Sequence, residues 1–505
     1  MYIFKRNIFI ISVLGILCFS CQKKPMDYFV LPSTDNIDGY ENYDSNTIVN
    51  IVLAKADNEH VQLVFKVNPN EHYSISNLQN KSNIEINCRK IESINGFDDV
   101  LVPVSKDFII QDSIAKLWIS FKTNHKSVPG VYNHKLIIEG KQSKLVVPIT
   151  IKVYNVELPL KPSIPAAFGI IEKNLPYPEN SDREAKASIR EKWANLCLDY
   201  KINPYFSTWL ESSMKHEAYS SPWAWNDTRT YQFLADERFN RYALPYHSLS
   251  KEELNQMLQT YERKDILPQA YFYLWDEPVL TSEYKQINSF AKTIHEIAPQ
   301  AKVLTTFYCG PQDGEFKDQL FSVFDLWKDY TQIYCMSAWA LQTDENKADT
   351  ARLLLRNHDE WWTYVCMGPG GKEPNLLLSM TGYQHRAVLW RSWKEKTSGF
   401  LYWAVNAFDN MQNLTFRKDL PEGDGVLIYP GEIMNSQDPL VSVRLERWRD
   451  SMEDYEYLTL LETKIGRAEA ETIFESIYQS PAQYADNYQL INKFRENVLI
   501  IIQNQ

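Results

Sequence analysis

Two adjacent carboxylic acids, Asp276 and Glu277, are the residues of this chain best placed to do chemistry. They follow an apolar and aromatic run at residues 271–275, which has the character of a buried strand. In an α/β barrel, catalytic residues lie at the carboxyl ends of the strands. The position of the two acids therefore predicts a pair of active-site carboxyl groups.

The backbone must turn if both acids are to reach one pocket, because successive side chains of a strand point to opposite faces. Pro278 favours such a break, since it disfavours helical backbone at Glu277 and cannot donate a hydrogen bond to a neighbouring strand. Other Asp-Glu pairs, at residues 236–237, 344–345 and 359–360, have polar or helix-like surroundings. A solvated turn before a helix is the alternative interpretation of Asp276 and Glu277.

Hydrolysis of a glycosidic bond is one reaction that such a pair can serve. It needs a proton for the leaving oxygen and a group that stabilises the oxocarbenium-like centre, and two carboxyl groups in different environments can divide these tasks. Neighbouring residues seldom place their carboxylates across a sugar ring, so the usual pairing of nucleophile and acid is strained. A 2-acetamido sugar removes this difficulty because its own carbonyl oxygen can attack the anomeric carbon.

The length of 505 residues is too great for one hydrophobic core, and about two or three domains are expected. The chain holds 14 Trp, 30 Tyr and 23 Phe, which is more than a core usually needs. Aromatic faces can stack on the apolar faces of sugar rings. The net charge of −11 argues against a nucleic-acid partner, which would require clustered Lys and Arg.

The first residues indicate export. Lys5 and Arg6 precede an apolar run at residues 8–17, which is too short for a permanent membrane span and is typical of a signal peptide. Ser20-Cys21 then resembles a bacterial lipoprotein cleavage site, although Cys18 stands where Leu is usual. We expect residues 1–21 to be a signal peptide and Cys21 to carry a lipid anchor. The protein would then face the periplasm or the outer cell surface.

No cofactor or catalytic metal is expected. The five cysteines that follow Cys21 have no Cys-x-x-Cys spacing, and the nine histidines include no His-Glu-x-x-His motif. Neither a disulfide framework nor a zinc site is therefore indicated. The sequence does not indicate an oligomeric state.

Residues 28–160 show a period of two in their apolar positions, as at Val61, Leu63 and Phe65, and helical patterns are scarce. Turn signals such as Pro129-Gly130 separate these runs. The pattern predicts an antiparallel β-sandwich. A proline-containing stretch at residues 158–162 would form a stiff linker.

Residues 161–465 alternate predicted strands with predicted helices and lack a Gly-rich dinucleotide loop. This pattern favours a (β/α)8 TIM-like barrel over an open sheet, so the fold class is multidomain, β followed by α/β. The Trp-rich and Tyr-rich segment 207–245 is interpreted as a loop over the barrel mouth. Residues 466–505 are expected to form a C-terminal helical segment that packs against the barrel.

Several motifs resemble glycoside hydrolase family 123 in their order along the chain, over about residues 165–461. They are Tyr273-Leu274-Trp275-Asp276-Glu277-Pro278, the runs 361–366 and 399–403, Gly423-Asp424-Gly425 with Tyr429-Pro430-Gly431, and the charged run 444–457. The resemblance implies a retaining β-N-acetylgalactosaminidase that uses substrate assistance on a glycoconjugate or oligosaccharide. Asp276 would match the acid that stabilises the acetamide, and Glu277 the general acid/base. Family membership does not fix the sugar.

Five further residues near predicted strand ends are candidates for substrate binding: Tyr308, Trp339, Tyr364, Trp403 and Asn406. A tryptophan could form the floor of a sugar pocket, an asparagine could bond a hydroxyl, and a phenol could hold the acetamide. Packed barrel-end aromatics are the alternative. Asp424, in a Gly-flanked turn, is a ligand to sugar or a turn residue, and the turn is favoured. The charged run 444–454 is interpreted as structural ion pairs along one helix.

Two other functions stay open. In one, the barrel is a glycosidase with Glu277 as acid and a distant carboxylate, Asp325 or Asp409, as nucleophile or base. A separation of about 5–5.5 Å would then indicate retention and about 6.5–9.5 Å inversion. In the other, the protein is a non-catalytic surface lipoprotein that binds glycans, which the anchor, the sandwich and the aromatic residues favour.

Overall fold

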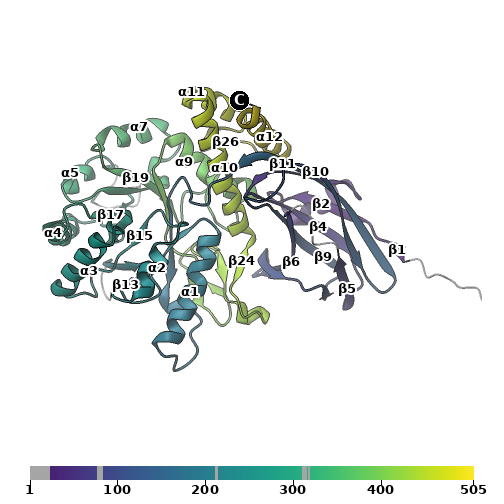
Figure 1. Cartoon of the computed structure of the whole chain (residues 1–505), viewed down its shortest axis with the longest axis horizontal. Helices are drawn as coiled ribbons and strands as arrows, with labels where there is room; N and C mark the ends of the chain where they lie inside the picture. The colour runs from purple at the N-terminus through teal and green to yellow at the C-terminus, as the bar shows by residue number, and fades with distance from the viewer. Residues whose placement is uncertain (1–22, 77–82, 211–213, 310–314, 317–318, 505) are drawn as a thin grey trace, which may run out of the picture.

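The computed structural model describes residues 23–76, 83–210, 214–309, 315–316 and 319–504. The predicted signal peptide and Cys21 lie outside the described residues. Two regions lie side by side in Figure 1, a β-rich region at one end and an α/β region at the other, with the C-terminal helices over their junction. Within the described residues, no helix is both long enough and apolar enough to cross a bilayer.

The β-rich region consists of two sheets in a sandwich-like arrangement. One has six strands: β1 (Lys24–Pro25), β11 (Ser143–Glu157), β10 (Gly130–Glu139), β5 (Glu71–Ser76) and β8 (Asp107–Ile110) in that order, with β3 (Val49–Lys55) also paired to β11. The other has seven: β2 (Tyr28–Pro32), β4 (Asn58–Lys66), β9 (Ile114–Lys122), β6 (Glu85–Ile94), β7 (Phe97–Pro103), β24 (Leu440–Ser442) and β23 (Ile428–Tyr429).

The predicted alternation explains the core between these sheets. Leu63 and Phe65 of β4 are buried with Leu117 of β9 from one sheet and Ile138 and Ile151 from the other. The prediction of a sandwich-like region is thus confirmed, but not every pairing is antiparallel. Strand β11 runs parallel to both β1 and β3.

Strands β23 and β24 come from a distant part of the sequence. Val441 pairs with Leu101, and Ser442 pairs with Val100, so β24 extends the sandwich sheet beyond β7. Three-residue strands are too short to show a period, and the sequence did not predict this pairing. The two regions are therefore joined by a shared sheet as well as by the linker.

The α/β region is built on a nearly closed nine-stranded sheet. In order, its strands are β14 (His216–Tyr219), β13 (Asn203–Trp209), β12 (Ala166–Ile171), β20 (Gly399–Tyr402), β19 (Glu360–Val365), β18 (Ile333–Ser337), β17 (Lys302–Phe307), β16 (Ala270–Tyr273) and β15 (Tyr242–Ala243). All neighbours are parallel except β13 and β14. Backbone hydrogen bonds from His216 to Leu274 and from Asp276 to Met214 connect β14 to the chain after β16.

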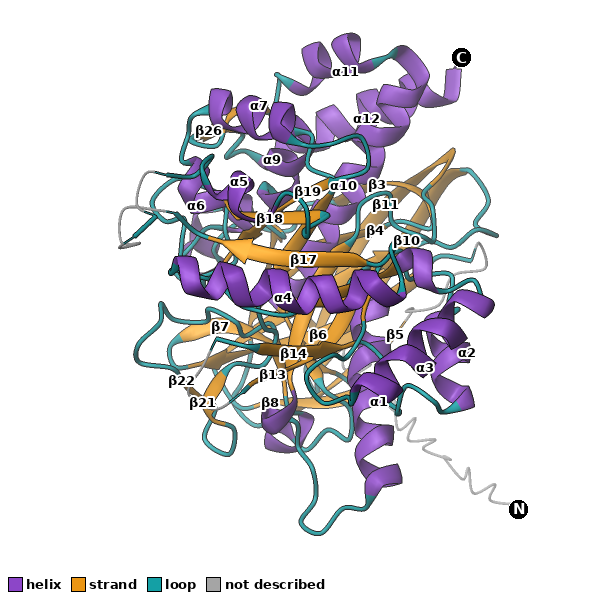
Figure 2. Ribbon diagram, turned by 90° about the vertical axis from the view of Figure 1, so that its left-hand side faces the viewer, coloured by secondary structure: helices purple, strands orange, loops and turns teal. Residues whose placement is uncertain are grey.

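The expectation of a regular (β/α)8 barrel is therefore met only in part, because the sheet is mixed and the antiparallel β14 lies where it would close. Helices cover its outer side, as α3, α4 and α5 do in Figures 1 and 2. They are α1 (Arg183–Asp199), α2 (Thr228–Leu234), α3 (Lys251–Arg263), α4 (Thr281–Ile297), α5 (Val323–Trp327), α6 (Ala338–Leu341), α7 (Glu345–Leu354), α8 (Gly382–Arg386) and α9 (Val388–Glu395).

Segment 207–245 is not the loop over the barrel mouth that its composition suggested. It contains the end of β13, all of β14, α2 and β15. Phe233, Phe239 and Tyr242 are buried, so some of its aromatic residues pack into the core, whereas Trp209, Trp223 and Trp225 are partly exposed. Elements of two to seven residues are too short for their periodicity to be recognised.

Helix α10 (Val443–Ile465) lies at the junction of the two regions and is buried almost all round. Its charged residues were expected to pair along the helix, but they mainly pair with other elements. Arg444 contacts Asp99 at 3.0 Å, and Asp454 contacts Arg386 at 2.7 Å. The helix can therefore bury its charged face as well as its apolar face.

The C-terminal segment is helical, with α11 (Arg467–Phe474) and α12 (Tyr488–Asn504). Two short hairpins, β21 (Phe408–Asn410) with β22 (Thr415–Phe416) and β25 (Tyr478–Ser480) with β26 (Gln483–Tyr484), complete the described strands. Helix α12 packs on α10 and on β3 and β11, through a cluster that includes Val52, Tyr154 and Leu499. The C-terminal segment thus packs on the α/β region, as predicted, through α10 and through Phe474 against Trp390 and Trp393, and it also packs on the sandwich.

Candidate active site

The two acids lie just beyond β16, at the carboxyl edge of the nearly closed sheet. Tyr271, Phe272 and Tyr273 of this strand are buried, whereas Asp276 and Glu277 are partly exposed. Glu277 has a φ of +41°, so the backbone leaves the extended conformation at this residue. This is the turn that the sequence required if both acids were to reach one place.

Thr306, in β17, contacts both acids. Its Oγ1 donates a hydrogen bond to Asp276 Oδ1 at 3.2 Å and accepts one from the Glu277 backbone N–H at 3.0 Å. A single hydroxyl thus links the side chain of one acid to the backbone of the other. The two residues are brought together, and neither turns away from the sheet edge.

Neutral groups hold the Asp276 carboxylate. Oδ1 accepts a hydrogen bond from the Tyr273 hydroxyl at 2.7 Å, and Oδ2 accepts one from Trp209 Nε1 at 3.1 Å. Within the described residues, Asp276 makes no ion pair. The carboxylate is therefore fixed in orientation while its charge is not neutralised by a cation.

Tyr364, at the end of β19, donates a hydrogen bond to Glu277 Oε1. Its own burial, and then the negative charge of Glu277, raise the pKa of the Tyr364 phenol well above its ordinary value. The hydroxyl therefore stays protonated and can only donate to a charged Glu277. Tyr364 was among the predicted substrate-binding residues, and the structure places it against the acid.

His216, in β14, forms part of the floor beneath Asp276. Its ring centroid lies 4.3 Å from that of Tyr273 and 5.1 Å from that of Trp209. Burial lowers the pKa of His216 to about 4, although the Asp276 charge opposes this shift. His216 is therefore a neutral aromatic wall at neutral pH. Trp209, His216 and Thr306 were not recognised from the sequence, because they come from strands remote in the chain.

Trp403 follows β20 and lies next to Trp209, with ring centroids 6.1 Å apart. Both indoles are partly exposed. Trp403 Nε1 donates a hydrogen bond to Asp424 Oδ1 at 3.0 Å. The structure thus places the predicted Trp403 on the rim beside the group that holds Asp276.

Tyr308 and Trp339 follow β17 and β18, and their ring centroids are 5.2 Å apart. Both are partly exposed, and Trp339 packs on Gly368 so closely that a side chain there would collide with the indole. Asn406 is different, because it is fully buried. Its amide accepts from the Ile171 N–H at 2.8 Å and donates to the Ile171 carbonyl at 3.1 Å, which ties the loop after β20 to β12.

Asp424 lies in the predicted Gly-flanked turn but also faces inward. It is buried, and its Oδ1 accepts a second hydrogen bond, from the Tyr402 hydroxyl at 3.2 Å. Burial raises its pKa to about 6, although bonds from Trp403 and Tyr402 oppose the shift. Within the described residues, Oδ2 has no hydrogen-bond partner. Flanking glycines with φ of +77° and +70° were the sequence signal for its position.

The two distant carboxylates considered from the sequence lie outside this group. Asp325 is on α5, where 80% of its side chain is exposed and it pairs with Lys328. Asp409 is exposed on β21. Three cavities, of about 830, 740 and 460 Å³, contain neither Asp276 nor Glu277 in their walls. Among the residues that the structure describes, no three His, Cys, Asp or Glu are grouped to hold a metal ion.

Comparison with known proteins gives one family and one fold. The model of the glycoside hydrolase 123 catalytic domain matches residues 188–461, more than half of the chain. No curated protein sequence matches. A family 123 glycoside hydrolase from Clostridium perfringens, studied for glycolipid glycan hydrolysis, is 15% identical with a TM-score of 0.62 over 94% of this chain and 98% of its own.

A Bacteroides uniformis β-glucuronidase is a weaker likeness, with 9% identity and a TM-score of 0.33 over 80% of this chain and 48% of its own. The match to the catalytic-domain model includes Asp276, Glu277 and the elements that hold them. The chain therefore belongs to glycoside hydrolase family 123 and is a glycosidase.

Proposed function

We propose that the protein removes terminal β-linked N-acetylgalactosamine, or a related 2-acetamido sugar, by a retaining and substrate-assisted mechanism. The observation that carries this proposal is the linkage of Asp276 and Glu277 through Thr306. Acids joined so closely suit a substrate that brings its own nucleophile.

Asp276 is assigned to the acetamide. With Oδ1 held by Tyr273 and Thr306 and Oδ2 held by Trp209, its carboxylate has one orientation in which to accept the acetamide N–H. The acetamide carbonyl oxygen then bonds to the anomeric carbon as the glycosidic bond breaks. The resulting oxazolinium carries a positive charge, which the Asp276 carboxylate stabilises because no cation pairs with it in the described residues.

Glu277 is assigned to the proton. Its carboxylic acid protonates the leaving glycosidic oxygen, and its carboxylate then takes a proton from the water that attacks the anomeric carbon. That attack opens the oxazolinium and restores the acetamide, so two inversions give net retention. Tyr364 fixes the side chain through its hydrogen bond to Oε1. The indoles of Trp209 and Trp403 offer apolar faces to the sugar ring.

The substrate is proposed to be a glycan of the cell exterior. The signal-peptide pattern and Cys21 support export as a lipoprotein. The related Clostridium perfringens enzyme was studied for the hydrolysis of glycolipid glycans, which makes such glycans one candidate for this protein.

The test uses nitrophenyl β-N-acetylgalactosaminide and a thiazoline analogue of the sugar. Asp276→Asn should lower kcat by about 10²–10³-fold, because it removes the charge that stabilises the oxazolinium. The thiazoline should inhibit the unaltered enzyme competitively. Asp325→Asn, at an exposed acid, is the matched control and should keep full activity. Turnover that persists in Asp276→Asn, or indifference to the thiazoline, would remove the substrate-assisted step.

A second mechanism is favoured by one observation, the buried Asp424. Burial, and then the charges of Glu277 and Asp424, raise the pKa of the Cys366 thiol, so both carboxyl groups lie near this thiol. Asp424 would then be the carboxylate partner of Glu277 in a glycosidase that needs no acetamide. In that case Asp424→Asn should abolish turnover, and the thiazoline should not inhibit.

A further inference from the structure

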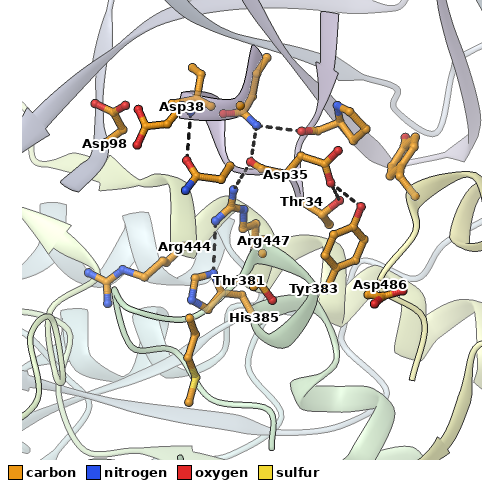
Figure 3. A pocket seen from close by; sticks show the side chains of 18 of the residues that line it. Thr34, Asp35, Asp38, Asp98, Thr381, Tyr383, His385, Arg444, Arg447 and Asp486 are labelled. Carbon is orange, nitrogen blue, oxygen red and sulfur yellow. Dashed lines mark hydrogen bonds between the residues drawn. The ribbon is translucent and has the colours of Figure 1, made fainter. Parts of the chain in front are cut away.

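A cavity of about 830 Å³ lies between the sandwich and the α/β region, away from Asp276 and Glu277. Residues 32, 34–39, 42–43, 62 and 96–99 line it from the sandwich side, and residues 378–383, 385, 486–489, Arg444 and Arg447 line it from the other. Figure 3 shows side chains from both sides converging on it. Its size is in the range of small-molecule binding sites.

Arg447 presents a buried cation to this cavity. The residue is 8% exposed, and within the described residues no carboxylate lies within ion-pair distance. Its guanidinium donates to the Ser33 carbonyl at 2.7 Å, to the Asp35 carbonyl at 3.3 Å and to His385 Nδ1 at 3.4 Å. Burial lowers the pKa of Arg447 to about 10, although the charges of Asp99, Asp450 and Asp35 oppose the shift. The group is a fixed donor on the wall.

Asp35 is a fixed acceptor beside that donor. Its carboxylate accepts hydrogen bonds from Tyr43 on the sandwich side and from Tyr383 on the other side, the latter visible in Figure 3. Both tyrosines and Asp35 are only partly buried. The cavity wall thus carries a carboxylate, a guanidinium and two aromatic rings, and all of them are held by contacts within the protein.

Charge decides which class of ligand this wall suits. The cavity-lining acids outnumber the arginines: Asp35, Asp38, Asp98, Asp99 and Asp486 against Arg444 and Arg447. Negative charge remains in excess when Asp99 is paired with Arg444 and Asp98 with Lys116. An anionic ligand is therefore disfavoured. A metal ion is disfavoured as well, since no suitable ligand cluster occurs within the described residues.

We propose that this cavity is a binding site for a neutral glycan, separate from the active site and independent of the reaction proposed above. Adjacent sugar hydroxyls each donate one hydrogen bond and accept others, and Asp35 and Arg447 offer one acceptor and several donors side by side. The rings of Tyr43 and Tyr383 offer surfaces on which a sugar face can stack. The site would hold a glycan at the junction of the two regions.

Calorimetric titration of the full-length protein with a neutral, galactose-terminated tetrasaccharide tests this proposal. Because the sugar lacks a terminal 2-acetamido residue, it is not a substrate of the proposed reaction. Asp35→Asn should weaken binding by about tenfold or more, since it removes a charged acceptor. Ser379→Trp alters only an exposed position and should block the cavity if Asp35→Asn fails to fold. A sulfated form of the same sugar should bind more weakly than the neutral form.

Asp325→Asn is the matched control for Asp35→Asn and should bind as the unaltered protein does. Hydrolysis of nitrophenyl β-N-acetylgalactosaminide should stay within about twofold in both cavity variants, as the cavity contains neither catalytic acid. Equal binding by all variants, or loss of binding when the thiazoline is present, would overturn the second site. A protein that binds the sugar but hydrolyses nothing would contradict the proposed function and leave the cavity proposal standing.

Discussion

Two groups of acids in this molecule have the same side-chain chemistry and opposite surroundings. Glu446 and Asp454 of α10 are fully buried, and arginines contact both of them: Asp454 receives two hydrogen bonds from Arg386 at 2.7 and 3.0 Å, and Glu446 pairs with Arg89. Asp276 and Glu277, beyond β16, are partly exposed. Phenols, a threonine and an indole contact them.

The surroundings of each acid correspond to its role. Burial alone would raise the pKa of Glu446, but Arg89 and Arg449 hold it below its ordinary range, so this acid stays charged and committed to its partners. Neutral donors fix a carboxylate without cancelling its charge. Arginines therefore suit acids that hold elements together, and hydroxyls and indoles suit an acid that must act on a ligand.

Loss of the acid/base should give the largest effect. Glu277→Gln should lower kcat/KM by about 10²–10⁴-fold, because the amide cannot transfer the proton, while the melting temperature changes little. Glu296→Gln, an exposed acid on α4, is the control. Assays of nitrophenyl glycoside hydrolysis measure kcat/KM, and thermal melts measure the melting temperature. If the Glu277→Gln variant unfolds but keeps its turnover per folded molecule, Glu277 has a structural role and the contrast between the two groups of acids is wrong.

Substitution of the buried Arg386 should have the opposite effect, a loss of stability without a loss of activity. Arg386→Met removes the closest cation of Asp454, which keeps only Arg495 at 3.4 Å, and the only cation paired with Asp450 in the described residues. The change should cost about 3–5 kcal/mol of unfolding free energy. Urea unfolding measures this cost, and activity per folded molecule should stay unchanged. Arg229→Met, at the exposed pair with Glu184, should cost less than about 1 kcal/mol. Equal costs for the two variants would contradict the assignment.

Asp424 combines features of both groups, because it is a buried acid without an arginine bonded to its carboxylate. Its folded-state pKa of about 6 lies above the ordinary 3.8, so its favourable contribution is complete below pH 3.8 and is lost as pH rises through 6. Relative to Asp424→Asn, the unaltered protein should lose about 2–3 kcal/mol of stability between acidic and neutral pH. If the difference in unfolding free energy between the unaltered protein and Asp424→Asn is the same at every pH, the pKa of Asp424 is not raised.

Removal of one neutral donor should give the smallest effect. Tyr364→Phe deletes the hydrogen bond to Glu277 and should lower kcat/KM by about tenfold, since one bond to a charged group is lost. Tyr334→Phe, in the neighbouring β18 but stacked on Phe324 outside the site, should leave the rate unchanged. If both variants behave alike, Tyr364 has only a packing role.

The sequence predicted what depends on local pattern. The run before Asp276 has enough buried aromatic residues to specify β16, and Pro278 correctly marked the break that Glu277 makes with its positive φ. Alternating apolar residues likewise predicted the sandwich-like region. Each of these features depends only on residues that are close together in the sequence.

Contacts across the chain could not be predicted in this way. The hydroxyl that links the two acids comes from Thr306, and the indole that holds Asp276 comes from Trp209, in strands separated from β16 by helices. Helix α10 was predicted as amphipathic with pairs along its surface, because a pattern cannot show that Asp99 and Arg386 supply partners for its charges. Tertiary pairing overrode the local signal.

The pairing of β24 with β7 has a consequence for synthesis of the chain. Val441 and Ser442 leave the ribosome more than 300 residues after Leu101 and Val100, which they meet. Until β24 is synthesised, β7 is an edge strand with unpaired backbone N–H and C=O groups, although the sandwich strands of the same sheet are already present. An emerging chain with such an edge is open to pairing with another copy of itself, so chaperone capture during translation would protect it.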